Sequence, residues 1–113
     1  MKIGVLLTTS KEHGNTNTVL DISGAALKDG HEVGIFLMDD GVYNIVKTSE
    51  SDELYVADKF SDLIKQGVEI ALCDQTARER GVNKENSIEG VVFGGQFDLA
   101  VLVNESDRFL AFN

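Results

Sequence analysis

Three runs of mostly apolar residues, each followed by a polar loop or a helical pattern, constrain the fold more than any other feature. They lie at residues 3–7, 33–38 and 68–72. Apolar runs of this length are typical of strands that are buried on both faces of a sheet. Because such strands alternate with helices and the loops are short, we predict a parallel α/β sheet.

Helical spacing of apolar side chains fills the gaps between these runs. It predicts one helix over residues 19–27, ended by Gly30, and another over residues 56–64, preceded by Ser49 and Asp52 at the spacing of a capping box. The remaining predicted elements are a short helix at 74–80, a brief strand at 91–93, a helix at 97–103 and a last strand at 108–112.

The length and charge of the chain narrow its possible partners. Its 113 residues are near the commonest domain size, so we expect a single domain over residues 1–113. The 19 acidic and 10 basic residues give a formal net charge of −9, which argues against direct contact with nucleic acid or an anionic membrane, because both need clustered Lys and Arg. No apolar run approaches the roughly 20 residues of a membrane span, and the N-terminus lacks the pattern of a signal peptide. We expect a cytoplasmic protein.

Cys73 is the single cysteine, and it stands between the third apolar run and the short predicted helix. The helix N-terminus and the nearby Arg78 and Arg80 favour a thiolate, whereas the adjacent Asp74 opposes it by like-charge repulsion. A reactive thiol and a small packed core residue are therefore both open interpretations. One cysteine cannot form an internal disulfide, and with two histidines it makes a poor zinc site, so we expect no metal.

The loop at Thr9–Thr18 is rich in hydroxyl and amide side chains and leads into a predicted helix. It is similar to the phosphate cradle of flavodoxin-type proteins, so one alternative is a small flavin- or nucleotide-binding module. A helix cap formed by Asn15, Thr16 or Asn17 is the other interpretation. The candidate contact residues in this loop are Thr9, Ser10, Gly14 and Asn15.

A second group of candidates follows the second apolar run. Asp39, Gly41, Tyr43 and Asn44 come directly after a predicted strand, so we expect them at the same edge of the sheet as Cys73. An exposed aromatic side chain in such a loop often anchors a contact between proteins.

Four segments, in this order along most of the chain, resemble the DsrE/DsrF-like family. They are DGHEV at 29–33, GVYN at 41–44, Cys73 followed by RGV at 80–82, and a C-terminal part with EGV at 89–91, FDLA at 97–100 and DRFLAF at 107–112. The family includes sulfur-relay subunits of tRNA 2-thiolation and of bacterial sulfur oxidation.

The resemblance implies a three-layer, flavodoxin-like α/β fold with a mostly parallel sheet of four to five strands flanked by helices. It also implies assembly into trimers or hexamers. The cysteine matching Cys73 accepts sulfur as a persulfide and passes it on, so the resemblance implies a sulfurtransferase or persulfide carrier without a cofactor. Its partners would be sulfur-donor and sulfur-acceptor proteins. Some members have a second cysteine three residues later, where this chain has Thr76, so a dithiol mechanism within one chain is not expected.

In this interpretation the loops at the carboxyl edge of the sheet line the mouth of the site around Cys73. The expected partner-binding residues are Thr9, Ser10, Gly14, Asn15, Asp39, Gly41, Tyr43, Asn44, Arg78 and Arg80. The alternative within the same family is a non-catalytic oligomeric protein in which Cys73 is merely packed.

Overall fold

The computed structural model describes residues 1–47 and 56–113. The strands are β1 (Lys2–Leu7), β2 (Glu32–Leu37), β3 (Glu69–Cys73), β4 (Val92–Gly94) and β5 (Arg108–Phe112). The helices are α1 (Asn15–Lys28), the 3-10 helix η1 (Asp39–Ile45), α2 (Val56–Lys65), α3 (Asp74–Glu79) and α4 (Gln96–Glu105). The predicted capping box at Ser49 and Asp52 lies outside the described residues.

The strands form one five-stranded sheet in the order β4-β3-β2-β1-β5, and every neighbouring pair is parallel. The predicted α/β class is therefore confirmed, and the sheet is parallel throughout. β1 and β2 are central and share six paired positions, from Lys2 opposite Glu32 to Leu7 opposite Leu37. In parallel sheets the carboxyl ends of all strands meet at one edge, which here carries η1 and α3.

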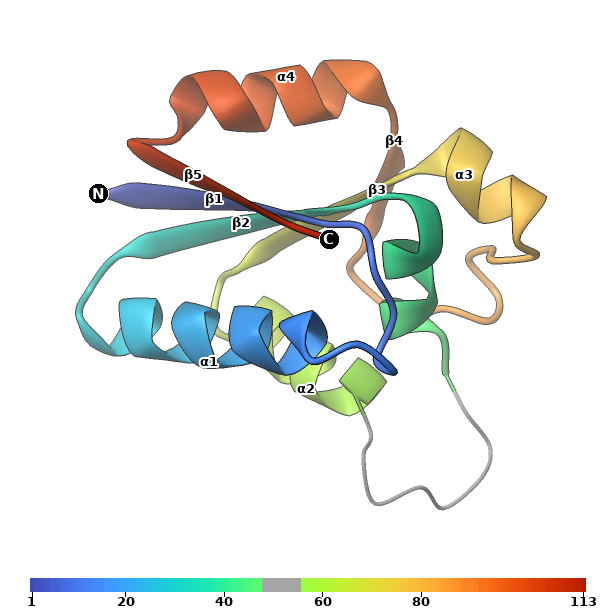
Figure 1. Ribbon diagram of the computed structural model, residues 1–113, viewed down its shortest axis with the longest axis horizontal. Coiled ribbons are helices and arrows are strands. Elements are labelled where there is room, and N and C mark those ends of the chain that lie inside the picture. Colours follow the sequence, from blue (N-terminus) through green and yellow to red (C-terminus); the bar gives the residue numbers. More distant parts are fainter. Residues whose placement is uncertain (48–55) are drawn as a thin grey trace.

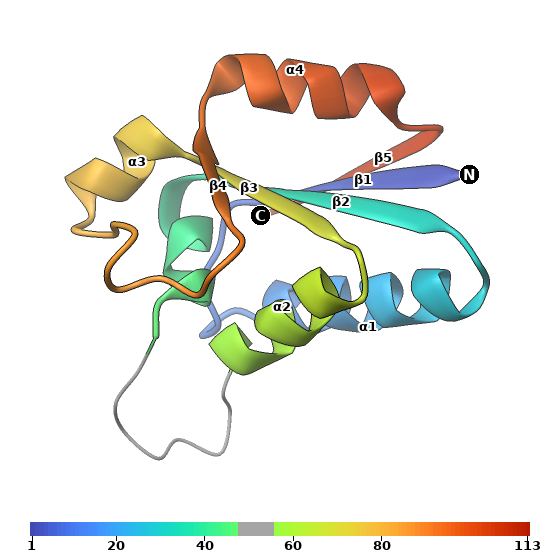
Figure 2. The same ribbon diagram turned by 180° about the vertical axis from the view of Figure 1, so that it is seen from behind.

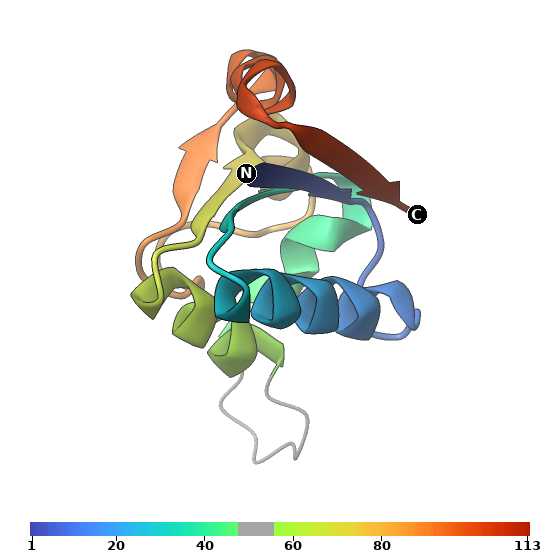
Figure 3. The ribbon, with the colours of Figure 1, turned by 90° about the vertical axis from the view of Figure 1, so that its left-hand side faces the viewer.

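Helices cover the two faces of the sheet unequally (Figures 1 and 3). From β1 to β4 the chain steps toward one edge each time, so right-handed connections place α1 and α2 on the same side. From β4 the chain returns to β5 at the opposite edge, and α4 therefore crosses the other face (Figure 2). The short helix α3 lies at the carboxyl edge and covers neither face.

The face that packs against α1 and α2, here called the α1/α2 face, holds the main core. Val19 of α1 and Phe60 of α2 are completely buried there, as the predicted helical spacing requires. The strand residues that alternate toward this face are Val5, Leu7, Ile35, Leu37, Ile70 and Leu72.

The opposite face, here called the α4 face, has a smaller core of Phe36, Cys73 and Leu102. Two paired strand glycines, Gly4 and Gly34, lie under α4. A Cβ atom on Gly34 would stand 2.6 Å from Cδ1 of Leu102, and one on Gly4 would meet Ser106 and Phe109. These missing side chains let α4 approach β1 and β2 closely, which explains where it sits on the face.

Several local predictions hold and others need correction. Gly30 ends α1 as predicted, with φ of 81°, and Gly67 ends α2 in the same way, with φ of 99°. The segment after β2, expected to be a loop, is the 3-10 helix η1. The predicted cap of α1 is wrong, because Gly14 occupies the N-cap position and Asn15 is already helical. Among the described residues, no helix is long and apolar enough to cross a membrane.

Candidate functional site

Cys73 ends β3 and is also the N-cap residue of α3. In the sheet it pairs with Gly94 of β4. Its side chain is 7% exposed and packs with Phe36 and Leu102 on the α4 face. The thiol therefore lies at the carboxyl edge of the sheet, in apolar surroundings. The contact between Phe36 and Cys73 could have been predicted from the alternation of side chains along β2 and β3, because these two residues occupy the same face of neighbouring strands.

The carboxylate next to Cys73 has a partner. Asp74 Oδ2 lies 3.3 Å from Nε of Arg78, one turn later in α3. Both side chains are largely exposed, so the pair is a solvated one. The guanidinium of Arg78 offsets the negative charge of Asp74, which would otherwise oppose a Cys73 thiolate.

Arg80 ties the end of α3 to η1. Its Nε donates a hydrogen bond to Asp40 at 3.0 Å, and Nη1 reaches the carbonyl of Thr76 at 3.5 Å. The hydrogen bond to Asp40 raises the pKa of Arg80 above its already high value. Arg80 thus links the segment after Cys73 to the segment after β2, and the two elements at the carboxyl edge are held together.

Asn44 is buried and organises the loops that follow β1 and β2. Its Nδ2 donates to the carbonyls of Thr9 and Gly41, both at 2.9 Å, and its Oδ1 accepts from Thr16 at 3.1 Å. Gly41 also packs against the carbonyl of Leu7 so tightly that a side chain could not fit. The family-like GVYN segment therefore has a structural role that its sequence alone did not reveal.

The residues flanking Asn44 are arranged differently. Asp39 starts η1 with φ of 51°, a left-handed conformation that Asp tolerates better than most residues. Tyr43 is exposed, as the sequence predicted for an aromatic in this segment.

In the loop after β1, Asn15 donates a hydrogen bond from its side chain to the carbonyl of Asn113. Among the described residues, the hydroxyl of Thr9 is buried without a hydrogen-bond partner.

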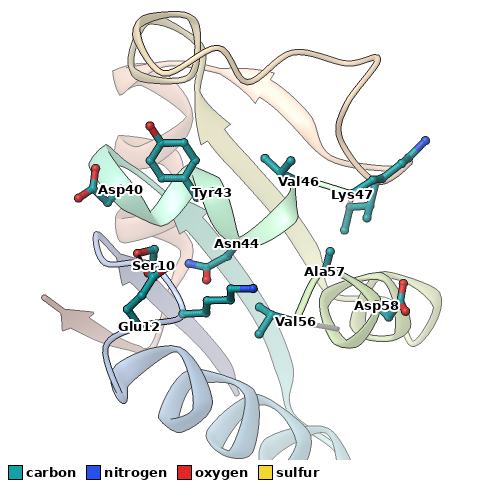
Figure 4. A pocket seen from close by; sticks show the side chains of 12 residues that line it. Ser10, Glu12, Asp40, Tyr43, Asn44, Val46, Lys47, Val56, Ala57 and Asp58 are labelled. Carbon is teal, nitrogen blue, oxygen red and sulfur yellow. Dashed lines mark hydrogen bonds between the residues drawn. The ribbon is translucent and has the colours of Figure 1, made fainter. Parts of the chain in front are cut away.

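A cavity of about 670 Å³ lies beside η1 (Figure 4). Three of the predicted contact residues line it, namely Ser10, Tyr43 and Asn44. Glu12 and Asp40, which were not predicted, line it beside them. Its apolar part comes from Val56 and other residues at the start of α2 (Figure 4). Ser10 donates a hydrogen bond to Glu12, which lowers the pKa of that carboxyl.

Cys73 is not among the residues that line this cavity. The structure therefore separates the predicted site into two parts. The loop residues Ser10, Tyr43 and Asn44 gather around the cavity, whereas the thiol packs on the α4 face. Arg80 contacts Asp40 at the cavity rim and is the link between the parts. Within residues 1–47 and 56–113, no cluster of His, Cys, Asp and Glu side chains is suited to a metal ion.

Two proteins of similar sequence come from Methanopyrus kandleri and Methanocaldococcus jannaschii. The uncharacterized protein MK0008 of Methanopyrus kandleri is 36% identical over 96 residues, which cover 84% of this chain and 79% of that protein. The uncharacterized protein MJ0989 of Methanocaldococcus jannaschii is 31% identical over 119 aligned positions, covering 99% of this chain and all of that protein.

Solved structures share the fold. The YchN protein of E. coli superimposes with a TM-score of 0.84 at 20% identity, covering 98% of this chain and 97% of that one. MTH1491 of Methanobacterium thermoautotrophicum, a protein of unknown function, has a TM-score of 0.73 at 18% identity and covers 98% of both chains. At these identities the likeness concerns the fold.

The sequence also matches a protein-family model. The model of the DsrE/DsrF-like family matches residues 1–112, so the match runs through every strand and helix described above. The chain belongs to the DsrE/DsrF-like family.

Proposed function

We propose that the protein is a persulfide carrier, a sulfurtransferase that accepts and passes on sulfur at Cys73. The observation that carries the proposal is the position of this thiol at the end of β3, directly beside an Asp74 whose charge is offset by Arg78. Family membership supports it, because the family includes sulfur-relay subunits. A sulfur relay in the cytoplasm is also compatible with a lone cysteine, since thiols are kept reduced there.

The proposed chemistry has two balanced steps. The Cys73 thiolate attacks the outer sulfur of a donor persulfide, a new S–S bond forms at Cys73, and the bond to the donor's inner sulfur breaks to release the donor thiolate. An acceptor thiolate then attacks the outer sulfur of the Cys73 persulfide and regenerates the Cys73 thiolate. No net oxidation occurs, so the chain needs no second cysteine at Thr76 and no cofactor.

The proposal gives roles to the surrounding residues. Arg78 offsets the charge of Asp74, and Arg80 holds α3 against η1 through Asp40. We also propose that a sulfur-donor protein and a sulfur-acceptor protein are its partners and that it assembles into a homo-oligomer, trimeric or hexameric. Thr9, Gly14, Asn15, Asp39 and Gly41 shape the loops at this edge, and exposed Tyr43 is an aromatic side chain there that a partner can contact directly.

Mass spectrometry of the intact protein tests the proposal. After incubation with a small-molecule persulfide, the wild type should gain one sulfur atom that a reducing agent removes, and Cys73→Ser should gain none. Circular dichroism of both proteins checks that the variant is folded. The proposal fails if the wild type gains no reducible sulfur or if Cys73→Ser gains as much.

The packed-cysteine alternative has one specific observation in its favour, the 7% exposure of Cys73 beside Phe36 and Leu102. Free cysteine often behaves as a small core residue. The rate of alkylation by iodoacetamide separates the two functions. A native thiol that reacts only as fast as global unfolding permits would favour the non-catalytic role.

A further inference from the structure

α4 is apolar around most of its circumference. Residues 97 and 99–103 are Phe, Leu, Ala, Val, Leu and Val, and only part of this surface contacts the sheet. Leu99 and Leu102 pack inward, whereas Phe97 is 79% exposed and Val101 is also exposed. A helix that is apolar all round is normally buried on more than one side. The outer side of α4 therefore presents an unusual apolar surface.

A groove of about 400 Å³ runs beside α4 on the α4 face. Its floor includes Phe36, Ala71 and Val92, and its wall includes Phe97 and Val101. Val92 is 55% exposed although it belongs to a strand. α4 lies over β1 and β2, and Figure 3 shows it above these central strands and not above β4 at the edge of the sheet. The groove is thus a concave apolar site next to an exposed aromatic side chain.

The charges around the groove are acidic. Glu69, Asp98 and Glu105 line it, and among the described residues Lys2 is the one basic residue in the lining. Lys2 is already engaged, because its Nζ lies 3.8 Å from Glu69 and 3.7 Å from Glu105. The groove therefore offers a partner an apolar floor with a net negative rim. Charge complementarity calls for apolar side chains flanked by Lys or Arg.

A second copy of this chain would fit the groove poorly if it met the groove through its own groove. If two copies met through the same face, the carboxylates of Glu69 and Glu105 would approach their equivalents, and like charges across an interface disfavour association. A different protein with a basic, apolar segment avoids this repulsion.

The groove also adjoins the candidate thiol. Val92 is two positions before Gly94, the residue that pairs with Cys73, and Leu99 of α4 packs in the same cluster as Cys73. We propose that the groove between α4 and the β3–β4 edge is the docking site for a basic, apolar segment of a partner protein, with Phe97 as its main anchor. Docking there brings a partner next to Cys73. That use in sulfur transfer rests on the proposed function, whereas docking itself does not.

Light scattering first decides whether a second copy covers the groove. Wild type and Phe97→Ser should have the same molar mass in solution, because the proposal places another protein on Phe97. Phe97 is exposed, so its truncation leaves the core intact. A Phe97→Ser protein of lower mass than the wild type overturns the proposal in favour of self-association.

Nuclear magnetic resonance then tests the chemistry of the groove with defined probes. The labelled full-length protein is titrated with an amphipathic Leu/Lys peptide and with the Leu/Glu peptide of the same pattern. The Leu/Lys peptide should bind at least about tenfold more tightly, with shift changes confined to α4, β3 and β4. Equal binding of the two peptides, no binding, or shift changes centred on α1 and α2 contradict the proposal.

Three variants complete the test. Phe97→Ser should weaken binding of the Leu/Lys peptide about tenfold, as expected for an aromatic anchor. The matched control Leu110→Ser removes an exposed apolar side chain from β5 and should leave binding unchanged. Glu69→Lys should weaken binding as well. Phe97→Ser should still accept sulfur at Cys73 from a small-molecule persulfide, so a failed sulfur assay and failed docking remain distinguishable.

Discussion

The two faces of one sheet differ in how completely they are covered. On the α1/α2 face, two helices bury a continuous core that includes Leu72 and Phe60. On the α4 face, one helix covers a small cluster around Phe36 and leaves Val92 and Phe97 exposed. The single cysteine belongs to the second face. The α1/α2 face thus contributes most of the buried core, whereas the α4 face leaves apolar surface exposed.

The largest expected difference between the faces comes from removing a leucine from each. Leu72→Ala should lower the free energy of unfolding by about 4 kcal/mol, because the fully buried site cannot collapse. Leu102→Ala, at the margin of the smaller cluster, should cost only about 2 kcal/mol. Urea denaturation of both variants measures this. Equal losses would show that the α4 face is as well packed as the other one.

A glycine substitution tests the close approach of α4. Gly34→Ala should lower the free energy of unfolding by about 2 kcal/mol, because the new Cβ meets Leu102 and pushes α4 away from β2. Gly24→Ala is the matched control, since open space surrounds this position in α1. It should stabilise the protein by about 0.5–1 kcal/mol. A neutral Gly34→Ala would mean that α4 adjusts its position freely.

The ion pair beside Cys73 has a smaller effect, on reactivity rather than on stability. Arg78→Ala should slow alkylation of the native Cys73 thiol about threefold at neutral pH, because the charge of Asp74 is then uncompensated. Asp74→Asn should accelerate the same reaction. Lys84→Ala removes a positive charge elsewhere on the surface and serves as the control. Indistinguishable rates for all variants would show that these charges do not act on the thiol.

The smallest effect concerns the carboxyl at the cavity beside η1. The hydrogen bond from Ser10 lowers the pKa of Glu12, so Ser10→Ala should return that pKa toward its ordinary value. A carboxyl with a lowered folded-state pKa contributes stability above its unfolded pKa and loses it as the pH falls through the folded value. The wild type should therefore lose this small contribution in acid, and the variant should lack it at neutral pH.

A side-chain NMR titration of Glu12 measures the change directly. Unchanged titration of Glu12 in Ser10→Ala would show that the two side chains do not interact in solution.

Much of the fold could be predicted from the sequence because its signals are local. The apolar runs marked the first three strands, and β5 has the predicted bounds 108–112. Helical spacing identified the buried residues Phe60 and Leu63 of α2. The cap of α1 could not be predicted in this way, because several residues with good capping side chains follow Gly14 and local preference does not choose among them.

The candidate site was harder to predict. Its residues were expected together because they follow parallel strands at one edge of the sheet. Side chains at this edge can, however, point toward either face of the sheet. The cavity with Tyr43 and Asn44 and the cluster with Cys73 differ in which way their side chains point. The role of Asn44 in joining Thr9 to Gly41 also depends on two loops far apart in sequence.

Periodicity and residue identity are local properties, so the chain's residues were enough to predict the α/β class, the order of the strands and α-helices, the family and the single thiol at the end of β3. Which helix covers which face of the sheet depends on the strand order, and that order became known only from the tertiary structure. The return of the chain from β4 to β5 placed α4 on the otherwise bare side, and the paired Gly4 and Gly34 drew it over β1 and β2. As a result, Cys73 lies under apolar side chains, while Phe97 and Val92 remain exposed.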